Sequence, residues 1–263
     1  MQKRWIIAES GGTKTDWVLL QDGEIIQQLQ TGSFHPQLLT DTAVETVSAL
    51  IPDLLRPENV FIIYSAGCYR EEGKQLMREK LSSLKAEIHI KSDLEAAIAC
   101  TGKESGWVAI LGTGSALMRF DQDGFELFGG LGWESGDEGS GFYFGKLIVE
   151  AILAGEEFSE IDKEQQEFLR NNLGKPASKQ AFSQLSKQLD KSVYAKYHRL
   201  NVELFIQRYL IPNQVEKICL VGGYVAFVLD EVKDVFEKYS IEIECVISKP
   251  ITQIVHYFRD KQR

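Results

Sequence analysis

The stretch "WIIAESGGTKTDWVLL", residues 5–20, decides the fold of this chain. An apolar run ends at Glu9, a glycine turn follows at residues 10–13, and a second apolar run begins at Thr15. A P-loop needs Gly-x-x-x-x-Gly-Lys-Ser/Thr leading into a helix, whereas a strand-like run follows Gly12. The stretch therefore predicts a β-hairpin. Its glycine tip lets the backbone and its N–H groups come close to phosphate oxygens.

The same pattern returns about 100 residues later, in "WVAILGTGSALMRFDQDGFELF", residues 107–128. Both copies run strand, glycine turn, strand, Asp-Gly turn, strand, with Asp22-Gly23 in the first and Asp123-Gly124 in the second. Asp-Gly between apolar runs is a strong hairpin signal. Coincidence is one interpretation, because meanders with glycine turns are common. An internal duplication into two similar lobes is the other, and we favour it.

Each half then alternates between helix-like and strand-like segments. A βββαβαβα order predicts a mixed sheet covered by helices in each half. The expected strands are 4–9, 15–20, 24–29, 60–67, 87–92, 107–111, 116–120, 125–128, 217–223 and 243–248. The expected helices are 40–50, 71–84, 93–101, 140–154 and 225–238. The region 155–213 is polar and helix-like, and we expect a solvated helical insertion there without chemistry.

Length and composition restrict the function classes. The chain has 263 residues, enough for one large domain or two lobes. Its net charge of −9 argues against general nucleic-acid or membrane binding, and no apolar run is long enough to span a bilayer. The N-terminus leads straight into a strand and lacks the features of a signal peptide. The four cysteines are scattered, which predicts reduced, structural cysteines in a cytosolic protein.

Four motifs together resemble the BadF/BadG/BcrA/BcrD-type ATPase and N-acetylglucosamine kinase family of the actin, hexokinase and Hsp70 superfamily. They are Ser-Gly-Gly-Thr-Lys-Thr-Asp-Trp (10–17), Leu-Gly-Thr-Gly-Ser (111–115), Gly-Gly-Leu-Gly-Trp-Glu-Ser-Gly-Asp-Glu-Gly-Ser-Gly (129–141) and Val-Gly-Gly-Tyr-Val-Ala (221–226). The resemblance implies two duplicated ribonuclease H-like lobes, the actin-like ATPase fold, with a cleft between them. It implies an N-terminal lobe of residues 1–103 plus 250–263 and a C-terminal lobe of residues 104–249.

The resemblance also implies an ATP site with Mg²⁺. In the family an aspartate at the start of the first hairpin orients Mg²⁺, usually through water. This chain has Glu9 there, so the carboxylate lies one methylene further out. The implied ATP contacts are Gly11, Gly12, Thr13, Lys14, Thr15, Gly112, Thr113, Gly114, Ser115, Gly222, Gly223 and Ala226.

Asp93 is the candidate general base for the incoming hydroxyl. Ser92 and Glu95 have the spacing of a capping box, which places Asp93 in the first turn of a helix. The helix dipole there favours an ionised carboxylate, as a base requires. An ordinary aspartate at a helix start is the alternative interpretation. The family carries its catalytic aspartate in an Asp-x-x-x-Ala setting, which Asp93 and Ala97 match.

The resemblance implies an acceptor-sugar site on several loops. His35 stands where many relatives have an asparagine that touches the sugar. Trp133 is a candidate for stacking on a sugar face, with a core tryptophan as the alternative. The implied sugar contacts are His35, Ser65, Gly67, Gly130, Gly132 and Asp137.

The sequence thus predicts an ATP- and Mg²⁺-dependent kinase of an amino sugar, located in the cytoplasm. Which sugar accepts the phosphoryl group is left open, and so is a homodimer. A non-catalytic sugar or nucleotide sensor of the same fold is the first alternative, favoured by the departures at Glu9 and His35. An ATPase that activates a dehydratase through a cysteine-held iron–sulfur cluster is the second.

Overall fold

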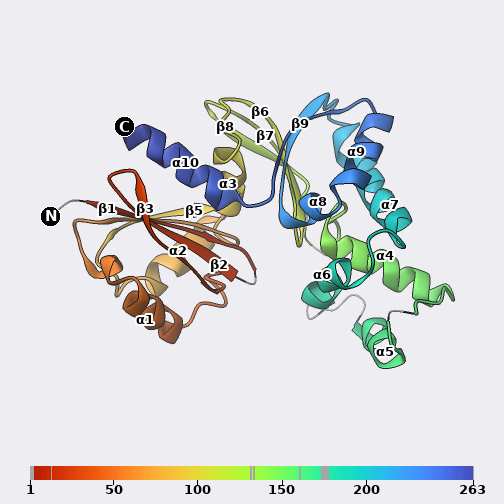
Figure 1. The fold of residues 1–263 in the computed structure, drawn as a ribbon, viewed down its shortest axis with the longest axis horizontal. Coiled ribbons are helices and arrows are strands. Elements are labelled where there is room, and N and C mark those ends of the chain that lie inside the picture. Colours follow the sequence, from red (N-terminus) through yellow and green to blue (C-terminus); the bar gives the residue numbers. More distant parts are fainter. Residues whose placement is uncertain are drawn as a thin grey trace. The chain divides into compact units, whose positions relative to one another are not determined.

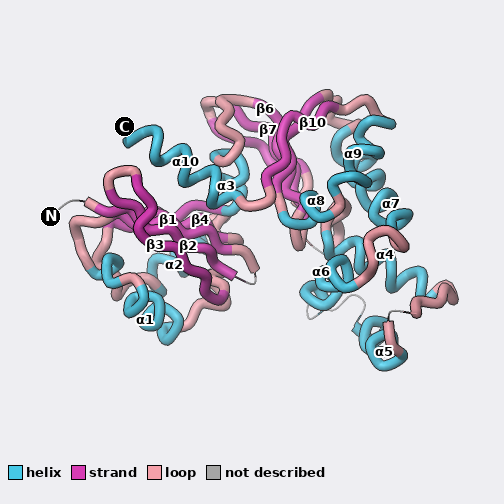
Figure 2. The backbone as a smooth tube through the Cα atoms, viewed as in Figure 1, coloured by secondary structure: helices cyan, strands magenta, loops and turns pink. Residues whose placement is uncertain are grey.

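The computed structural model describes residues 3–12, 14–130, 132, 134–159, 161–172 and 178–262. The chain divides into two compact units, one of Met1–Lys103 with Lys249–Arg263 and one of Glu104–Ser248. Each unit holds a five-stranded mixed sheet with helices packed on it, which confirms the expected α/β class (Figure 2). The cleft expected between the lobes stays a prediction.

The first unit is built on a sheet with the strand order β3-β2-β1-β4-β5. The first three strands are antiparallel neighbours, while β4 and β5 run parallel to β1. Its elements are β1 (Arg4–Ser10), β2 (Lys14–Gln21), β3 (Glu24–Gly32), α1 (Asp41–Leu50), the 3₁₀ turn η1 (Pro52–Leu55), β4 (Val60–Ser65), α2 (Glu71–Lys80), β5 (Glu87–Ser92), α3 (Asp93–Ala99) and α10 (Pro250–Gln262).

The central strand β1 explains why the opening stretch is so apolar. Ile6, Ile7 and Ala8 are fully buried, because helices cover both faces of the sheet. The edge strand β3 instead alternates between exposed and half-buried positions. Asp22 and Gly23 both have positive φ, at 52° and 75°, as the predicted Asp-Gly hairpin turn requires.

The two faces of this sheet carry different helices (Figure 1). Ile6, Ala8 and Trp17 pack with residues of α1 and α2 in one core cluster. The opposite face is covered by α3 and α10, and the rings of Trp5 and Phe258 lie 5.8 Å apart there. Successive strand residues alternate between faces, so Glu9 lies on the α3/α10 face with Trp5.

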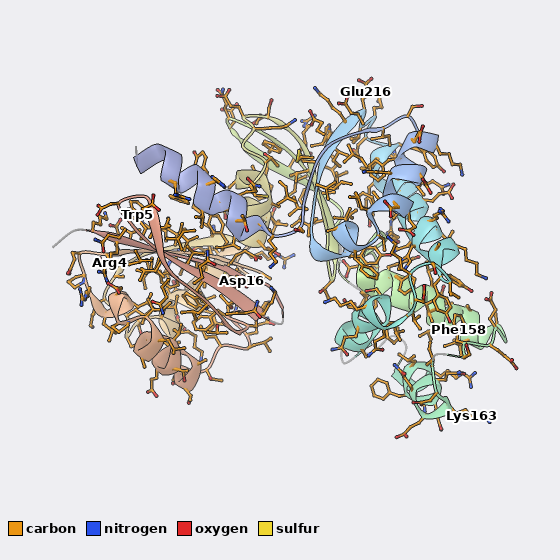
Figure 3. All side chains as sticks on the ribbon, viewed as in Figure 1. Arg4, Trp5, Asp16, Phe158, Lys163 and Glu216 are labelled. Atoms are coloured by element: carbon orange, nitrogen blue, oxygen red, sulfur yellow. A yellow bond between two sulfur atoms is a disulfide. The ribbon has the colours of Figure 1, made fainter. Side chains whose placement is uncertain are left out.

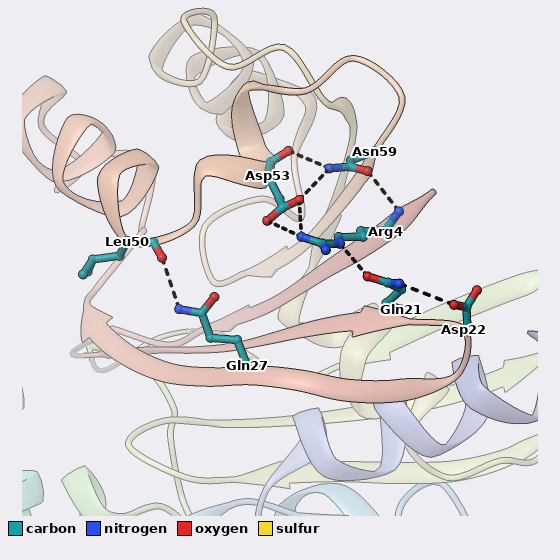
Figure 4. Close-up of polar contacts among 7 residues, drawn as sticks. All are labelled: Arg4, Gln21, Asp22, Gln27, Leu50, Asp53 and Asn59. Atoms are coloured by element: carbon teal, nitrogen blue, oxygen red, sulfur yellow. Dashed lines mark hydrogen bonds and ion pairs between the residues drawn. The ribbon is translucent and has the colours of Figure 1, made fainter. Parts of the chain in front are cut away.

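Polar side chains hold the amino end of β1 (Figure 4). The Arg4 guanidinium donates to both carboxylate oxygens of Asp53, at 3.0 and 3.1 Å, and to Gln21. The Arg4 backbone N–H donates to Asn59 Oδ1 at 2.9 Å, and Asn59 donates to Asp53. These contacts tie β1 to η1 at the end opposite the glycine turn.

The second unit repeats the topology of the first. Its sheet order is β10-β9-β6-β7-β8, with β6, β7 and β8 antiparallel and β9 and β10 parallel to β6. Its elements are β6 (Gly106–Leu111), β7 (Ser115–Asp121), β8 (Gly124–Phe128), α4 (Gly141–Leu153), α5 (Lys163–Asn172), α6 (Ser178–Gln188), α7 (Ala195–Phe205), the π-helical turn η2 (Ile206–Leu210), β9 (Lys217–Val221), α8 (Gly223–Phe227), α9 (Leu229–Lys238) and β10 (Glu242–Ile247). The matching strand orders confirm the duplication.

The helices between α4 and β9 are more than a solvated insertion. Leu169, Phe182 and Leu185 are at most 1% exposed and belong to the core of the second unit. Helix α6 packs closely on α4, since a Cβ added at Gly145 would lie 2.3 Å from the Phe182 carbonyl oxygen. The polar sequence here reflects the outer faces of these helices.

The prediction of reduced cysteines is wrong for one pair. Cys219 and Cys245 stand opposite each other on β9 and β10, with Cα atoms 4.7 Å apart, and form a disulfide. Cys68 and Cys100 are buried free thiols. The pair lies 26 residues apart in sequence, so only the register of two parallel strands brings it together. Over the described residues, the helices fall short of the length and apolarity needed to cross a membrane.

Candidate functional site

The first candidate site lies at the carboxyl ends of β1, β4 and β5. These strands are parallel, so their ends meet at one edge of the sheet. Ser10 pairs with Ser65, and Ser65 pairs with Ser92, so the residues that follow each strand come together. Glu9, the turn at Gly67 and Asp93 are thereby brought to one edge of the first unit.

The first glycine turn is tight and open. The Gly11 N–H donates to the Lys14 carbonyl at 3.0 Å, which closes the turn. A Cβ added at Gly11 or Gly12 would meet nothing within 4 Å, so the tip has space for a ligand. Thr13 lies outside the described residues. The Lys14 ammonium is half-exposed and pairs with Asp16 at 2.8 Å.

Two predicted ligand contacts in this unit instead have buried hydroxyls. Thr15 and Ser65 are fully buried, as is Ser10. The Phe34 N–H donates to Ser10 Oγ at 2.8 Å and to Thr15 Oγ1 at 3.0 Å, and Ser65 Oγ donates to the Phe34 carbonyl at 3.0 Å. The hydroxyls of Thr15 and Ser65 hold the loop at Phe34, and the ligand contacts predicted for these two residues stay predictions.

The held loop presents His35. Its backbone N–H donates to Ser33 Oγ, and its Nδ1 accepts from the Gln37 N–H at 3.3 Å. Gly67 has a φ of 83°, and a Cβ there would lie 2.5 Å from His35 Nε2. The imidazole therefore lies directly over Gly67, which explains why this position requires glycine.

Glu9 stands in an electrostatically costly position. Its cross-strand neighbour is Asp16, the residue labelled near one end of β2 in Figure 3. Burial, and then the negative charges of Asp16 and Asp93, raise the pKa of Glu9 to about 7, although Lys14 opposes this. Asp16 goes the other way: burial raises its pKa, but hydrogen bonds from Lys14 and Gln30 outweigh this and lower it.

Asp93 is the first residue of α3, as predicted. The capping box is present: Ser92 Oγ accepts from the Glu95 N–H at 3.2 Å, and Glu95 Oε2 accepts from the Ser92 N–H at 2.8 Å. Asp93 Oδ1 accepts from the Leu94 N–H at 3.1 Å. The carboxylate is half-buried and stabilised by the helix terminus, which suits a proton acceptor.

The second glycine turn, in the second unit, joins β6 to β7. The Gly112 N–H donates to the Gly114 carbonyl at 3.0 Å, and Thr113 is exposed at the tip. The Gly112 and Thr113 carbonyls accept from the N–H groups of Gly141 and Phe142, at 2.9 and 3.2 Å. The start of α4 is therefore bonded directly to the turn.

The sugar contact predicted for Asp137 stays a prediction, and the structure places this residue against the second glycine turn. It is 3% exposed, has a φ of 70°, and its Oδ1 accepts from the Ser115 N–H at 2.9 Å. A Cβ at Gly114 would lie 2.9 Å from the same oxygen. The carboxylate is packed against the second glycine turn and stabilises it.

The other predicted loop positions are placed as follows. Gly130 and Gly132 have φ of 66° and 78°, and a Cβ at Gly132 would meet nothing within 4 Å. Gly130 instead lies against Ala116 and Leu127. Trp133 lies outside the described residues.

The third glycine turn, after β9, packs on the second. Gly222 has a φ of 137°, and a Cβ there would lie 2.4 Å from the Leu111 carbonyl oxygen. Gly223 is exposed and open, while Ala226 is half-buried in α8. The turn thus adjoins the second glycine turn through backbone contact.

The sequence missed several residues that bind the 135–140 loop. Glu138 is 5% exposed, forms an ion pair with Arg208 and accepts from the Tyr209 hydroxyl at 3.0 Å. Asn201 binds Gly139 and Ser140. Asn201 lies in α7, and Arg208 and Tyr209 lie in η2. These partners are about 60 to 70 residues further along the chain than the loop, so no local spacing in the sequence indicates them.

The described residues include no cluster of three or more metal-binding side chains. Mg²⁺ in phosphoryl-transfer sites is held by one or two carboxylates together with water and the substrate phosphates. The facing carboxylates of Glu9 and Asp16 therefore fit Mg²⁺ bound chiefly through the nucleotide.

No protein-family model matches the chain. Its structure is similar to that of a candidate N-acetylglucosamine kinase from Porphyromonas gingivalis, with a TM-score of 0.80 and 22% identity over 98% of this chain and 99% of that one. A second candidate N-acetylglucosamine kinase, from Chromobacterium violaceum, matches with a TM-score of 0.66 and 18% identity over 96% and 98%. A ROK family glucokinase from Streptomyces griseus, solved with glucose and AMPPNP, matches with a TM-score of 0.50 and 14% identity over 96% and 97%. The chain therefore shares the duplicated α/β fold of these solved structures.

Proposed function

We propose that this protein transfers the γ-phosphoryl group of ATP to a hydroxyl of an amino sugar, with Asp93 as the general base. One observation carries the proposal: the parallel strands β1, β4 and β5 bring Glu9, the Gly67 turn and Asp93 to one edge of the first sheet. A glycine hairpin with an open tip adjoins that edge. The fold shared with the candidate N-acetylglucosamine kinases supports a sugar kinase.

Each group has a role in this proposal. The glycine turns at Gly11–Gly12 and Gly112–Gly114, and the turn at Gly222–Gly223, bind the nucleotide through backbone N–H groups. Lys14 leaves Asp16 to neutralise phosphate charge. Asp93 accepts the proton of the attacking sugar hydroxyl. Phosphoryl transfer requires a protein to position the reactants and to supply a base for this proton.

Mg²⁺ would be held by Glu9, through water, and by the nucleotide phosphates. When bound, it neutralises charge that develops on the transferring phosphoryl group. His35, Gly67, Gly130 and Gly132 are the proposed contacts of the acceptor sugar. Within this class we propose N-acetylglucosamine or a related amino sugar, in line with the two candidate kinases of the same fold.

The test is a coupled ADP-release assay over a panel of amino sugars. Asp93→Asn removes the base but keeps the shape, and we expect a loss of about 10²-fold or more in kcat. Asp41→Asn is the matched control, because Asp41 is likewise the first residue of a helix, α1, and lies outside the site. Parent-like turnover in the Asp93 variant would exclude it as the base.

A non-catalytic sugar or nucleotide sensor is the second candidate. The position of Glu9 favours it, because a pKa of about 7 leaves a large share of this carboxyl protonated at neutral pH. A sensor predicts sugar affinity by calorimetry with no ADP release for any sugar in the panel. The cysteines do not favour the dehydratase-activator alternative, since Cys219 and Cys245 pair within one sheet and Cys68 and Cys100 are buried.

A further inference from the structure

A buried polar cluster in the second unit takes no part in the chemistry proposed above. It consists of His198 and Asn201 from α7 and Tyr224 from α8. His198 and Asn201 are fully buried, and Tyr224 is 6% exposed. Burying polar groups is costly unless they are paired, and a hydrogen-bonded buried cluster of this kind rigidifies the structure around it.

Asn201 uses its whole amide. Its Oδ1 accepts from the Gly139 N–H at 2.7 Å, and its Nδ2 donates to the Ser140 carbonyl and to the Tyr224 hydroxyl, at 2.8 and 2.9 Å. A backbone N–H can only donate and a carbonyl can only accept, so the orientation of the amide is unambiguous. Asn201 therefore binds the backbone of two successive residues, the Gly139 N–H and the Ser140 carbonyl, just before α4 begins.

Tyr224 completes the cluster through His198. Its hydroxyl accepts from Asn201 and lies 2.9 Å from His198 Nδ1. Burial lowers the pKa of His198 to about 3, so the ring is neutral. The tyrosine proton is satisfied when Nδ1 accepts it, which fixes the hydroxyl direction. The Phe144 ring stacks on the His198 imidazole, with ring centroids 4.0 Å apart, and holds the plane of the imidazole.

The cluster joins two proposed nucleotide-binding turns. Ser140 precedes Gly141, whose N–H binds the Gly112 carbonyl in the second glycine turn. Tyr224 directly follows Gly222 and Gly223 in the third turn. We propose that Asn201 and Tyr224 are positioning residues that lock these two turns into one rigid nucleotide half-site. This inference rests on the proposed function, because it assumes that the two turns bind ATP.

The physical reason is pre-organisation. A glycine-rich turn loses much conformational entropy when it orders around phosphate. Turns that are already ordered in the free protein avoid that loss on binding, and affinity rises accordingly. The cluster supplies this order from the core side of the turns.

The experiment compares two single-atom deletions. Tyr224→Phe removes the hydroxyl shared by Asn201 and His198. Tyr197→Phe is the control: Tyr197 lies on α7 and is buried to the same extent as Tyr224, but its hydroxyl donates to Glu156 at 2.6 Å, a contact with no link to the turns. Hydrogen–deuterium exchange is followed in peptides covering residues 136–142, and AMPPNP affinity is measured by calorimetry.

We expect Tyr224→Phe to raise exchange at Gly139 and its neighbours and to weaken AMPPNP binding about 10-fold, with sugar affinity unchanged. Tyr197→Phe should leave exchange and AMPPNP affinity as in the parent. Equal exchange and equal affinity in the two variants would overturn the inference, whatever their melting temperatures. If Tyr224→Phe does not fold, Asn201→Ala makes the same comparison and keeps the Tyr224–His198 pair.

The exchange measurement separates the two proposals. If the parent binds no AMPPNP, the proposed function fails. Faster exchange at residues 136–142 in Tyr224→Phe alone would then still show that the cluster orders the loop. Parent-like exchange in Tyr224→Phe, with AMPPNP bound normally, would remove the inference and leave the proposed function standing.

Discussion

Glu9 shows how one side chain can couple stability to ligand binding. It lies one residue before the end of the central strand β1, faces Asp16 across the hairpin and interacts with Asp93. A carboxylate in that setting is unfavourable in the free protein. A cation placed there would relieve the repulsion, so the residue that destabilises the free site is the one expected to favour Mg²⁺ and nucleotide.

The pH dependence of stability should expose Glu9. Its pKa is about 7 in the folded protein, against 4.5 for an unperturbed glutamate, so the native state binds more protons than the unfolded state between these two pH values. The free energy of unfolding therefore falls as pH rises from about 4.5 to 7, by up to about 3 kcal/mol before solvent screening is considered. Glu9→Gln should remove this pH dependence, and at pH 8 the variant should have a higher free energy of unfolding than the parent.

Urea unfolding at pH 5 and pH 8 measures the effect. Glu126→Gln is the matched control, an exposed carboxylate on β8 that pairs with Arg119, and it should keep the pH dependence of the parent. Parallel pH curves for the parent and Glu9→Gln would contradict the assignment of the raised pKa to Glu9.

At the scale of elements, the N-terminal ends of two helices determine where candidate site residues lie. Helix α3 begins at Asp93 because Ser92 caps it, and α4 begins at Gly141 because Ser140 accepts from the Tyr143 N–H. Helix α3 follows the end of β5, and α4 follows the 135–140 loop, which is bonded to the second glycine turn. A cap thus decides stability and also where a functional group lies.

Ser92→Ala tests this link. Loss of the cap should cost about 1 kcal/mol of unfolding free energy. Thr40→Ala is the matched control, because Thr40 caps α1 in the same way through the Ala43 N–H. We expect similar losses in thermal stability but a loss of kcat only in Ser92→Ala, since Asp93 is the next residue. Equal kcat in the two variants would show that the cap does not position Asp93.

At the scale of the whole molecule, the chain consists of two units with the same topology, each with its own core. The disulfide belongs entirely to the second unit and joins its neighbouring strands β9 and β10. It closes a loop that contains α8 and α9 and the third glycine turn. Its effect on stability should therefore be felt first in that unit.

Reduction of the disulfide should lower the stability of the second unit by about 3.5 kcal/mol, the loop-closure entropy expected for a loop of this length. Calorimetry with and without dithiothreitol measures the shift. The double variant Cys219→Ala/Cys245→Ala is the control and should not respond to dithiothreitol. A parent whose unfolding is the same in both conditions would show that the two thiols do not form this bond in solution.

Local signals in the sequence determined much of this protein. The two glycine turns, the Asp22-Gly23 hairpin turn and the Ser92–Glu95 capping box depend on residues a few positions apart, and each has the predicted conformation. The second hairpin turns one residue earlier than predicted, at residues 122–123, so that Gly124 is the first residue of β8. The apolar run in β1 likewise predicted a central strand. The repeated order of these elements was enough to predict the duplicated fold.

Only the tertiary structure decided what the polar side chains touch. Thr15 and Ser65 carry hydroxyls of the kind that bind ligands, yet packing turns these hydroxyls toward the backbone of Phe34. Asp137 turns toward Ser115, and Asn201 reaches Gly139 from 62 residues away. Burial and long-range hydrogen bonds depend on how distant segments meet, because a side chain's partner is set by three-dimensional packing and leaves no periodicity in the chain.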